Sequence, residues 1–246
     1  MSGSGAMGRL YGVGLGPGDP DLVTVKAVKA IAGAAVVAWF CKRGRRGHAR
    51  TIADGWMKPG VTELPLVYPV TVEIPFEDSA YVDALSGFYA EAAETLAGHL
   101  AQGRDVALLC EGDPFFYGSY MHMHERLKNR FPITVCPGVT GMSGCWTAAV
   151  QPMTWGDDVL TVLPGTLPAP ALAKRLADCD AAVIMKLGRN LPKVRAVLAD
   201  AGLVDRAFYV ERGTMADEVV MRLSEKTDDQ APYFSMILVP GRGRRP

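Results

Sequence analysis

Short apolar runs alternate with longer amphipathic segments along most of the chain. Residues 9–14 form an apolar run that leads into glycines, and Thr24 then precedes a segment whose apolar residues fall on one helical face. Residues 34–40 are apolar without alternation, which is typical of parallel strands buried on both faces. The start of the chain therefore predicts a strand, a glycine loop, a helix and a second strand.

The alternation continues, but its texture changes near residue 138. Before this point we expect strands at 61–66, 105–110 and 133–136, and helices at 79–100 and 117–130. After it we expect helices at 140–150, 170–177 and 191–199, and strands at 159–163, 182–185, 207–210, 218–223 and 233–239. The last three strands have little helix between them, which favours a mixed sheet. The sequence predicts an α/β protein of two domains: 1–138, with a mostly parallel sheet covered by helices on both faces, and 139–246, with a mixed sheet.

Composition supports a folded protein and argues against two classes of partner. Of the 246 residues 49% are hydrophobic, and 26 basic residues balance 26 acidic ones. This balance lacks the positive excess of a nucleic-acid-binding protein, so we expect no nucleic-acid partner. The longest apolar stretch, 31–41, is far shorter than the roughly 20 residues that cross a bilayer. We therefore expect no membrane partner either.

Cysteine and histidine usage favours the cytoplasm and no bound metal. The five cysteines are scattered without a CxxC pair, as in a reducing compartment. His122 and His124 are two apart in an expected helix, where they point to different faces and make a poor metal pair. Residues 1–8 lack the features of a signal peptide and are left out of the fold prediction. We expect most methionines to be core packing, except Met185, which ends a strand and could cover an adenine.

The first candidate site is the glycine-rich loop 12–20, GVGLGPGDP, between a strand and a helix. Glycines there would let a ligand approach the backbone at the edge where α/β sheets bind ligands. The dinucleotide pattern GxGxxG fails, because Pro17 or Asp19 stands where its third glycine belongs. No phosphate-binding GxxxxGK[ST] loop is present. A tight turn without a ligand remains the alternative.

Two further loops follow expected strands. In 111–118, EGDPFFYG, a carboxylate could accept hydrogen bonds from a ligand while the aromatics cover an apolar ring or a cation. The alternative is that Asp113 caps the next helix and the aromatics are core. In 136–144, CPGVTGMSG, backbone N–H groups and Thr140 could bind a ligand held between two domains. We expect these loops and the glycine-rich loop to converge at one edge of the sheet.

A basic stretch, 42–50, follows the second strand and should lie at the same edge. Five cations and one histidine in nine residues would attract an anion, and arginine binds carboxylates with two hydrogen bonds. The alternative is an ordinary solvated loop. The tail arginines Arg242, Arg244 and Arg245 are expected to be solvated.

Taken together, the motifs at 14–20, 112–118, 137–140 and 211–214 resemble the tetrapyrrole methylase family of S-adenosylmethionine-dependent enzymes. Their order and spacing cover residues 9–240, nearly the whole chain. The stretches 65–71 and 183–190 are similar to the members that methylate C20 of precorrin-2 in cobalamin biosynthesis.

The resemblance implies a two-domain homodimer that binds S-adenosylmethionine in a cleft between its domains. The cofactor contacts it implies are Pro17, Glu111, Gly112, Asp113, Phe116, Thr140, Gly141, Met185 and Gly213. Siroheme-forming relatives carry a catalytic aspartate after the second strand, whereas this chain has Trp-Phe-Cys-Lys-Arg at 39–43. Tyr117 and Glu111 are therefore the candidates for handling the C20 proton. Arg43, Arg45 and Arg46 are the candidates for binding the substrate's carboxylates.

Three alternatives remain at this point. The substrate could be the cobalt complex of the anaerobic route, or the chain could bind a tetrapyrrole or nucleotide without turnover. An NADP-linked oxidoreductase is also conceivable, since Lys42 and Arg43 could meet a 2′-phosphate, but the broken glycine spacing disfavours it.

Overall fold

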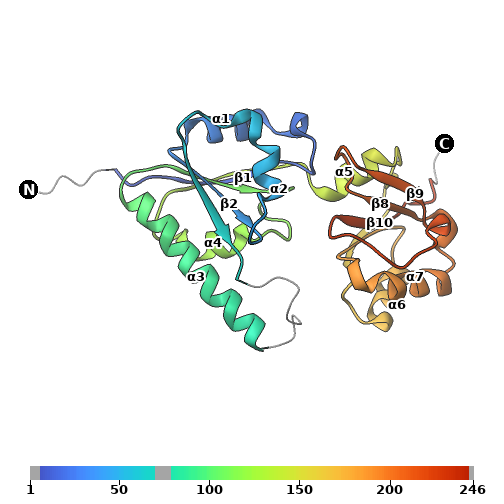
Figure 1. Cartoon of the computed structure of the whole chain (residues 1–246). Coiled ribbons are helices and arrows are strands. Elements are labelled where there is room, and N and C mark those ends of the chain that lie inside the picture. Colours follow the sequence, from blue (N-terminus) through green and yellow to red (C-terminus); the bar gives the residue numbers. More distant parts are fainter. Residues whose placement is uncertain (1–5, 70–78, 244–246) are drawn as a thin grey trace, which may run out of the picture. The chain divides into compact units, whose positions relative to one another are not determined.

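A computed structural model describes residues 6–69 and 79–243, with the side chains of 79–81 left aside. Residues 70 and 71 of one family stretch, the tail residues Arg244 and Arg245, and residues 1–5 lie outside the described residues. The chain divides into two compact units, Met1–Thr140 and Gly141–Pro246, each built on one β-sheet (Figure 1).

The N-terminal unit contains a five-stranded sheet of order β3-β2-β4-β1-β5 in which all the pairs are parallel. Its strands are β1 (Leu10–Gly14), β2 (Val36–Cys41), β3 (Thr62–Val67), β4 (Val106–Cys110) and β5 (Ile133–Cys136). The strands β2 and β4 are almost wholly buried, as their continuous apolar runs predict. The expected parallel sheet is confirmed.

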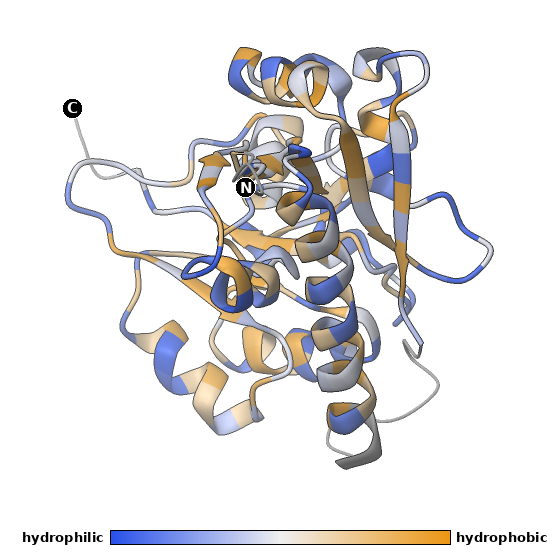
Figure 2. Cartoon of the chain, turned by 90° about the vertical axis from the view of Figure 1, so that its left-hand side faces the viewer, coloured by the Kyte–Doolittle hydropathy of each residue, from blue (hydrophilic) through white to orange (hydrophobic). Residues whose placement is uncertain are grey.

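Helices cover both faces of this sheet, as expected. They are α1 (Val25–Gly33), α2 (His48–Ile52), α3 (Ser79–Ala101) and α4 (Tyr120–Leu127), with 3-10 turns η1 (Pro20–Leu22) and η2 (Asp54–Trp56). The helices α3 and α4 pack on the face that carries Leu10 and Leu108, while α1 and α2 pack on the face that carries Val37 and Leu109. Because neighbouring strand residues point to opposite faces, one apolar strand serves two cores. Figure 2 shows this pattern as mostly apolar strands and helices that alternate polar and apolar positions.

Two local expectations need correction. The short helix α2 overlaps the end of the basic stretch 42–50, so the alternative of an ordinary solvated loop is wrong there. The sequence did not predict this helix because five residues are too few to show a helical period and one of them, Arg50, is charged yet buried. The helix expected at 117–130 spans only Tyr120–Leu127. Its start is delayed because Tyr117 has a φ of 57°, a left-handed conformation outside the helical region.

The C-terminal unit contains a sheet of order β6-β7-β10-β8-β9. Its strands are β6 (Leu160–Pro164), β7 (Ala181–Met185), β8 (Phe208–Glu211), β9 (Val219–Arg222) and β10 (Ser235–Val239). The pair β6–β7 is parallel and the other pairs are antiparallel, so the expected mixed sheet is confirmed. The helices α6 (Ala169–Ala177) and α7 (Leu191–Asp200) contribute to one core, and α5 (Gly141–Ala148) contributes to another. Three 3-10 turns complete the unit: η3 (Gly188–Asn190), η4 (Val204–Arg206) and η5 (Leu223–Glu225).

The strand order of the N-terminal unit marks a ligand-binding edge. The strands β1 and β4 are neighbours, yet α1 leaves β1 for one face of the sheet and α4 follows β4 onto the other. Ligands of open α/β sheets bind outside the carboxyl ends of strands at such a switch point. Within the described residues, no helix combines the length and apolarity that a membrane crossing requires.

Candidate functional site

The turns after β1, β4 and β5 meet at the switch point, as expected. Gly112 N donates to Gly16 O over 2.7 Å, and Gly16 N donates to Gly112 O over 3.3 Å. Gly138 N donates to Asp113 Oδ2 over 3.1 Å. Three segments far apart in the sequence are thus tied together by backbone and carboxylate hydrogen bonds.

Two of the glycines at these turns, Gly14 and Gly138, are required by contact between backbones. A Cβ on Gly14 would lie 2.6 Å from Gly138 N and 2.8 Å from Gly112 O, and a Cβ on Gly138 would overlap Gly112 O. The neighbouring turns, rather than a ligand, occupy the space that a side chain would need. Gly16 and Gly112 have φ values of 80° and 64°, which glycine adopts without strain. Pro17 is buried directly after Gly16 in this assembly.

Asp113 holds the second loop in place. Its Oδ1 accepts from Phe115 N over 2.9 Å, and its Oδ2 accepts from Gly138 N. The alternative that Asp113 caps the next helix is wrong, because α4 begins at Tyr120 with Ser119 at its N-cap. Each carboxylate oxygen keeps a second lone pair for a ligand donor.

The aromatics of this loop are not core residues. The side chains of Phe115 and Tyr117 are 47% and 46% exposed. The ring centroids of Phe116 and Tyr117 lie 4.9 Å apart in an edge-to-face arrangement. These aromatic groups therefore stand at the carboxyl edge of the sheet, where they can contact a ligand.

Glu111 reaches from the end of β4 to α2. Its Oε1 accepts from Ala49 N over 3.1 Å. Glu111 is half-buried, while Ala49 is buried. The side chain expected to handle a proton therefore already holds the first turn of a helix.

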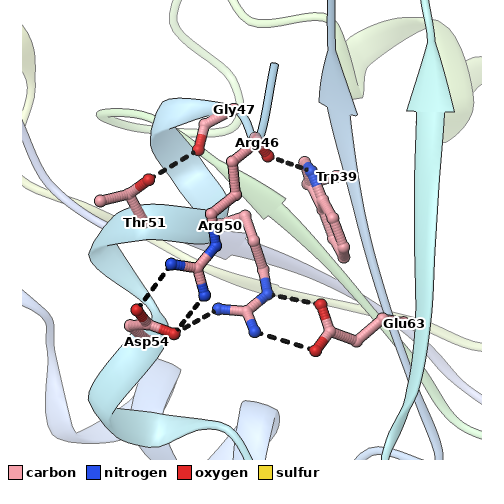
Figure 3. Close-up of polar contacts among 7 residues, drawn as sticks. All are labelled: Trp39, Arg46, Gly47, Arg50, Thr51, Asp54 and Glu63. Carbon is pink, nitrogen blue, oxygen red and sulfur yellow. Dashed lines mark hydrogen bonds and ion pairs between the residues drawn. The ribbon is translucent and has the colours of Figure 1, made fainter. Parts of the chain in front are cut away.

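Two of the five cations in the basic stretch are engaged in ion pairs (Figure 3). Arg46 donates twice to Asp54, over 2.6 and 2.9 Å. The buried Arg50 donates twice to Glu63, over 2.7 and 2.9 Å, and once to Asp54, over 2.8 Å. The hydrogen bonds from Arg50 lower the pKa of Glu63 and of Asp54 below their usual values. Neither carboxylate was anticipated from the sequence, since neither lies in a motif.

The remaining arginines stand on a tight turn. The side chains of Arg43 and Arg45 are exposed and have no hydrogen-bond or ion-pair partner among the described residues. Arg45 N donates to Lys42 O over 3.0 Å, which closes the turn. Trp39 Nε1 donates to Arg46 O over 2.7 Å and so holds the end of the turn. Among the arginines of the basic stretch, only Arg43 and Arg45 therefore have side chains without an ion pair to another described residue, and the turn that carries them is held in place.

In the C-terminal unit, the expected cofactor residues gather at one end of one sheet face. Met185 ends β7, and the pairing of Ile184 with Ile237 places it beside Met236 of β10. A Cβ on Gly141, at the start of α5, would lie 3.1 Å from Met236 Cε. Met236 joins this group, although in the sequence it stands out only by its core spacing.

Gly213 belongs to the same region, because it packs against α5. A Cβ on Gly213 would lie 3.0 Å from Cys145 Sγ. Burial raises the pKa of this thiol to about 11, so it stays protonated at neutral pH. The cleft between the two domains stays a prediction.

Backbone strain marks the same loops. Among the described non-glycine residues, left-handed φ values occur at Val150 and beside the expected cofactor residues: Tyr117, Lys186, Arg212 and Thr214. Tyr117 follows Phe116, Lys186 follows Met185, and Arg212 and Thr214 flank Gly213. Such strain costs about 1–3 kcal/mol per residue and clusters at ligand sites. The positions of these strained residues favour the same loops that the sequence predicts to bind the cofactor.

Comparison with known proteins identifies the fold and the family. The family model of the tetrapyrrole (corrin/porphyrin) methylases matches residues 9–227. The chain is 59% identical to a precorrin-2 C(20)-methyltransferase of Sinorhizobium sp. over the full length of both proteins. It is 28% identical to a cobalt-precorrin-2 C(20)-methyltransferase of Salmonella typhimurium, over 94% of this chain and 96% of that protein.

A solved structure of uroporphyrin-III C-methyltransferase from Thermus thermophilus, complexed with S-adenosylhomocysteine, has the same fold. The TM-score is 0.66 at 23% identity, covering 94% of this chain and 97% of that one. The resemblance and the two-sheet α/β architecture predicted from the sequence are confirmed, as are the methyltransferase class and S-adenosylmethionine as the methyl donor. The chain belongs to the tetrapyrrole (corrin/porphyrin) methylase family.

Proposed function

We propose that the chain methylates C20 of precorrin-2 to give precorrin-3A in cobalamin biosynthesis, with S-adenosylmethionine as methyl donor. The observation that carries the proposal is the 59% identity to a precorrin-2 C(20)-methyltransferase across both whole chains. The cobalt-precorrin-2 enzyme is only 28% identical, which favours the metal-free substrate over the cobalt complex.

The residues at the two sheet edges fit this methyl donor chemically. Asp113 has carboxylate lone pairs for a hydroxyl or ammonium group, Phe116 offers an aromatic face, and Met185 offers an apolar side chain for an adenine. When bound, S-adenosylmethionine supplies a methyl group on a positively charged sulfur. We assign its binding to Pro17, Gly112, Asp113, Phe116, Thr140, Gly141, Met185 and Gly213.

The main contribution of the protein to the reaction is positioning. Two backbone hydrogen bonds between Gly16 and Gly112, and one from Gly138 N to the short carboxylate side chain of Asp113, fix three turns. Reactants held in line at about 3 Å can save roughly 7–11 kcal/mol of barrier, because the entropy of bringing them together is already lost on binding. A rigid assembly of backbone turns suits this task.

A base is needed only after methyl transfer, when C20 loses its proton. Tyr117 is exposed at the carboxyl edge of the sheet, and its left-handed backbone conformation sets the direction of its Cα–Cβ bond. We therefore propose Tyr117 as the group that accepts or relays this proton. Glu111 is the other candidate, but its hydrogen bond with Ala49 gives it a second possible role.

The exposed Arg43 and Arg45 are proposed to bind carboxylates at the rim of the tetrapyrrole. Arg46 was expected to do the same, but its pair with Asp54 would have to open before it could bind substrate with two hydrogen bonds. We further propose, from the family resemblance, that the enzyme is a cytoplasmic homodimer; sedimentation of the purified protein would test the dimer.

The decisive experiment incubates the protein with isotope-labelled S-adenosylmethionine and precorrin-2 under anaerobic conditions. We expect one labelled methyl group at C20, assigned by mass spectrometry and NMR, with weaker turnover of the cobalt complex. Binding of both ligands without methyl incorporation would show a carrier rather than an enzyme. Calorimetric binding of NADPH in place of S-adenosylhomocysteine would favour the oxidoreductase alternative.

A further inference from the structure

The side chain of Glu111 joins two parts of the site that have separate tasks. The cofactor loop, residues 111–118, is assigned to the methyl donor, and the basic turn, residues 42–46, is assigned to the substrate's carboxylates. We propose that Glu111 is a positioning residue that couples the two, so that the cofactor loop fixes where the basic turn stands. This inference rests on the proposed function.

The main chain of Glu111 is fixed by its neighbours in the cofactor loop. Gly112 exchanges two backbone hydrogen bonds with Gly16, and Asp113 accepts from Gly138 N. Any shift of the turns after β1 or β5 is therefore transmitted to the residue that follows β4. Glu111 itself is half-buried, which limits the freedom of its side chain.

The side chain of Glu111 supplies the hydrogen-bond acceptor that the N-terminus of α2 lacks. The first N–H groups of a helix have no partner within the helix, and a side chain at the N-cap normally accepts from one of them. The N-cap of α2 is Gly47, which has no side chain to do so. Glu111 Oε1 accepts from Ala49 N in its place, over 3.1 Å. A carboxylate there also complements the positive end of the helix.

Beyond α2, ion pairs connect the helix to the basic turn, which an indole hydrogen bond also fastens to β2. Arg50 of α2 donates to Asp54, which also accepts two hydrogen bonds from Arg46. The carbonyl of Arg46 accepts from Trp39 Nε1. Arg46 ends the turn that carries Arg43 and Arg45, so a displaced α2 would displace both exposed cations.

This role makes a different prediction from that of a general base. A glutamine at position 111 keeps an oxygen that can accept from Ala49 N, but it cannot take up a proton. An alanine has neither property. Comparing the two substitutions therefore separates positioning from proton transfer.

The test measures kcat and KM for precorrin-2, and the Kd for S-adenosylhomocysteine, in wild type, Glu111→Ala and Glu111→Gln. Because a lost cap weakens the start of α2 and so loosens the basic turn, we expect Glu111→Ala to raise the KM about fivefold. Glu111→Gln should restore most of that loss. Glu94→Ala is the control, since Glu94 is an exposed carboxylate of α3 that pairs with Arg130 and belongs to neither the cofactor loop nor the basic turn. A kcat that collapses equally in the alanine and glutamine variants at unchanged KM would overturn the positioning role in favour of a base.

A second substitution breaks the same connection from its far end. Asp54→Asn leaves Glu111 intact but weakens the pairs that residue 54 makes with Arg46 and Arg50. We expect Asp54→Asn to raise the KM for precorrin-2, and its effect should not add to that of Glu111→Ala, because both interrupt one chain of contacts. Additive effects would contradict the coupling.

Hydrogen exchange gives a readout that does not depend on turnover. In wild type, S-adenosylhomocysteine should slow amide exchange in residues 47–52, and in Glu111→Ala this protection should be lost while the cofactor loop itself stays protected. Protection of 47–52 that persists in Glu111→Ala would refute the coupling even with both proteins folded. A wild type that binds the ligand but methylates no tetrapyrrole would refute the proposed function instead.

Discussion

Replacing Gly14 with alanine tests whether the three turns depend on direct backbone contact. The new Cβ would lie 2.6 Å from Gly138 N and 2.8 Å from both Gly112 O and Gly138 Cα. Since ordinary contacts of this kind begin at 3.4 Å, the turns must separate by roughly 0.6–0.8 Å. Gly138 N already lies 3.1 Å from Asp113 Oδ2, so a shift of this size in that direction breaks the bond.

The expected cost combines two terms. A hydrogen bond to a charged group contributes about 1.5–3 kcal/mol, and forcing extra atoms into a packed site costs about 1–3 kcal/mol. Alanine recovers about 0.5–1 kcal/mol, because glycine in a strand loses more chain entropy on folding. We expect Gly14→Ala to lower the free energy of unfolding by about 3 kcal/mol.

The assay is urea denaturation followed by circular dichroism, together with calorimetric titration of S-adenosylhomocysteine. The matched control is Gly98→Ala in α3 of the same unit, where a Cβ meets no atom within 4 Å. This control should gain about 1 kcal/mol, because alanine is the better helix former, and should bind the ligand as wild type does. If Gly14→Ala were as stable as wild type with an unchanged Kd, the turns would not be in the close contact from which the site is derived.

The remaining predictions concern strain, charge and pH. Val150→Gly should raise stability by about 1 kcal/mol and the Tm by about 2–4 °C, because an exposed valine with a φ of 50° is strained at a position that suits glycine; a lowered Tm would count against this. Arg43→Gln and Arg45→Gln should each raise the KM for precorrin-2 several-fold, with an effect that weakens at high salt and no change in S-adenosylhomocysteine affinity, whereas an unchanged KM would dismiss these residues as carboxylate ligands. Because Arg50 lowers the pKa of Glu63, the pair stabilises the protein fully above the carboxyl's ordinary pKa and is lost as the pH falls through the lowered value. The stability difference between wild type and Arg50→Met, measured by urea denaturation, should therefore be full at pH 7 and shrink below about pH 4; a difference that grows on acidification would contradict this sign.

The elements of the fold could be predicted because burial imposes local patterns on the sequence. Residues 34–40 are apolar without alternation because the strand they predict, β2, lies between two helical layers. Thr24 marks the start of α1 because its hydroxyl accepts from Ala27 N over 3.2 Å. The short helix α2 escaped prediction because its stability comes from Arg50, Glu63 and Glu111, two of which lie far away in the sequence.

The candidate site divides in the same way. The sequence alone determined that glycine and proline interrupt the chain after β1, β4 and β5, because turns that leave buried strands need those residues. The role of each residue there depends on contacts that form on folding. The tertiary structure assigned Gly14 and Gly138 to contact between backbones, committed Arg46 and Arg50 to carboxylates, and gave Glu111 a helix to hold. The physical reason is range: a strand or helix is encoded by neighbours in the chain, whereas an ion pair or a close backbone approach depends on partners that only folding brings near.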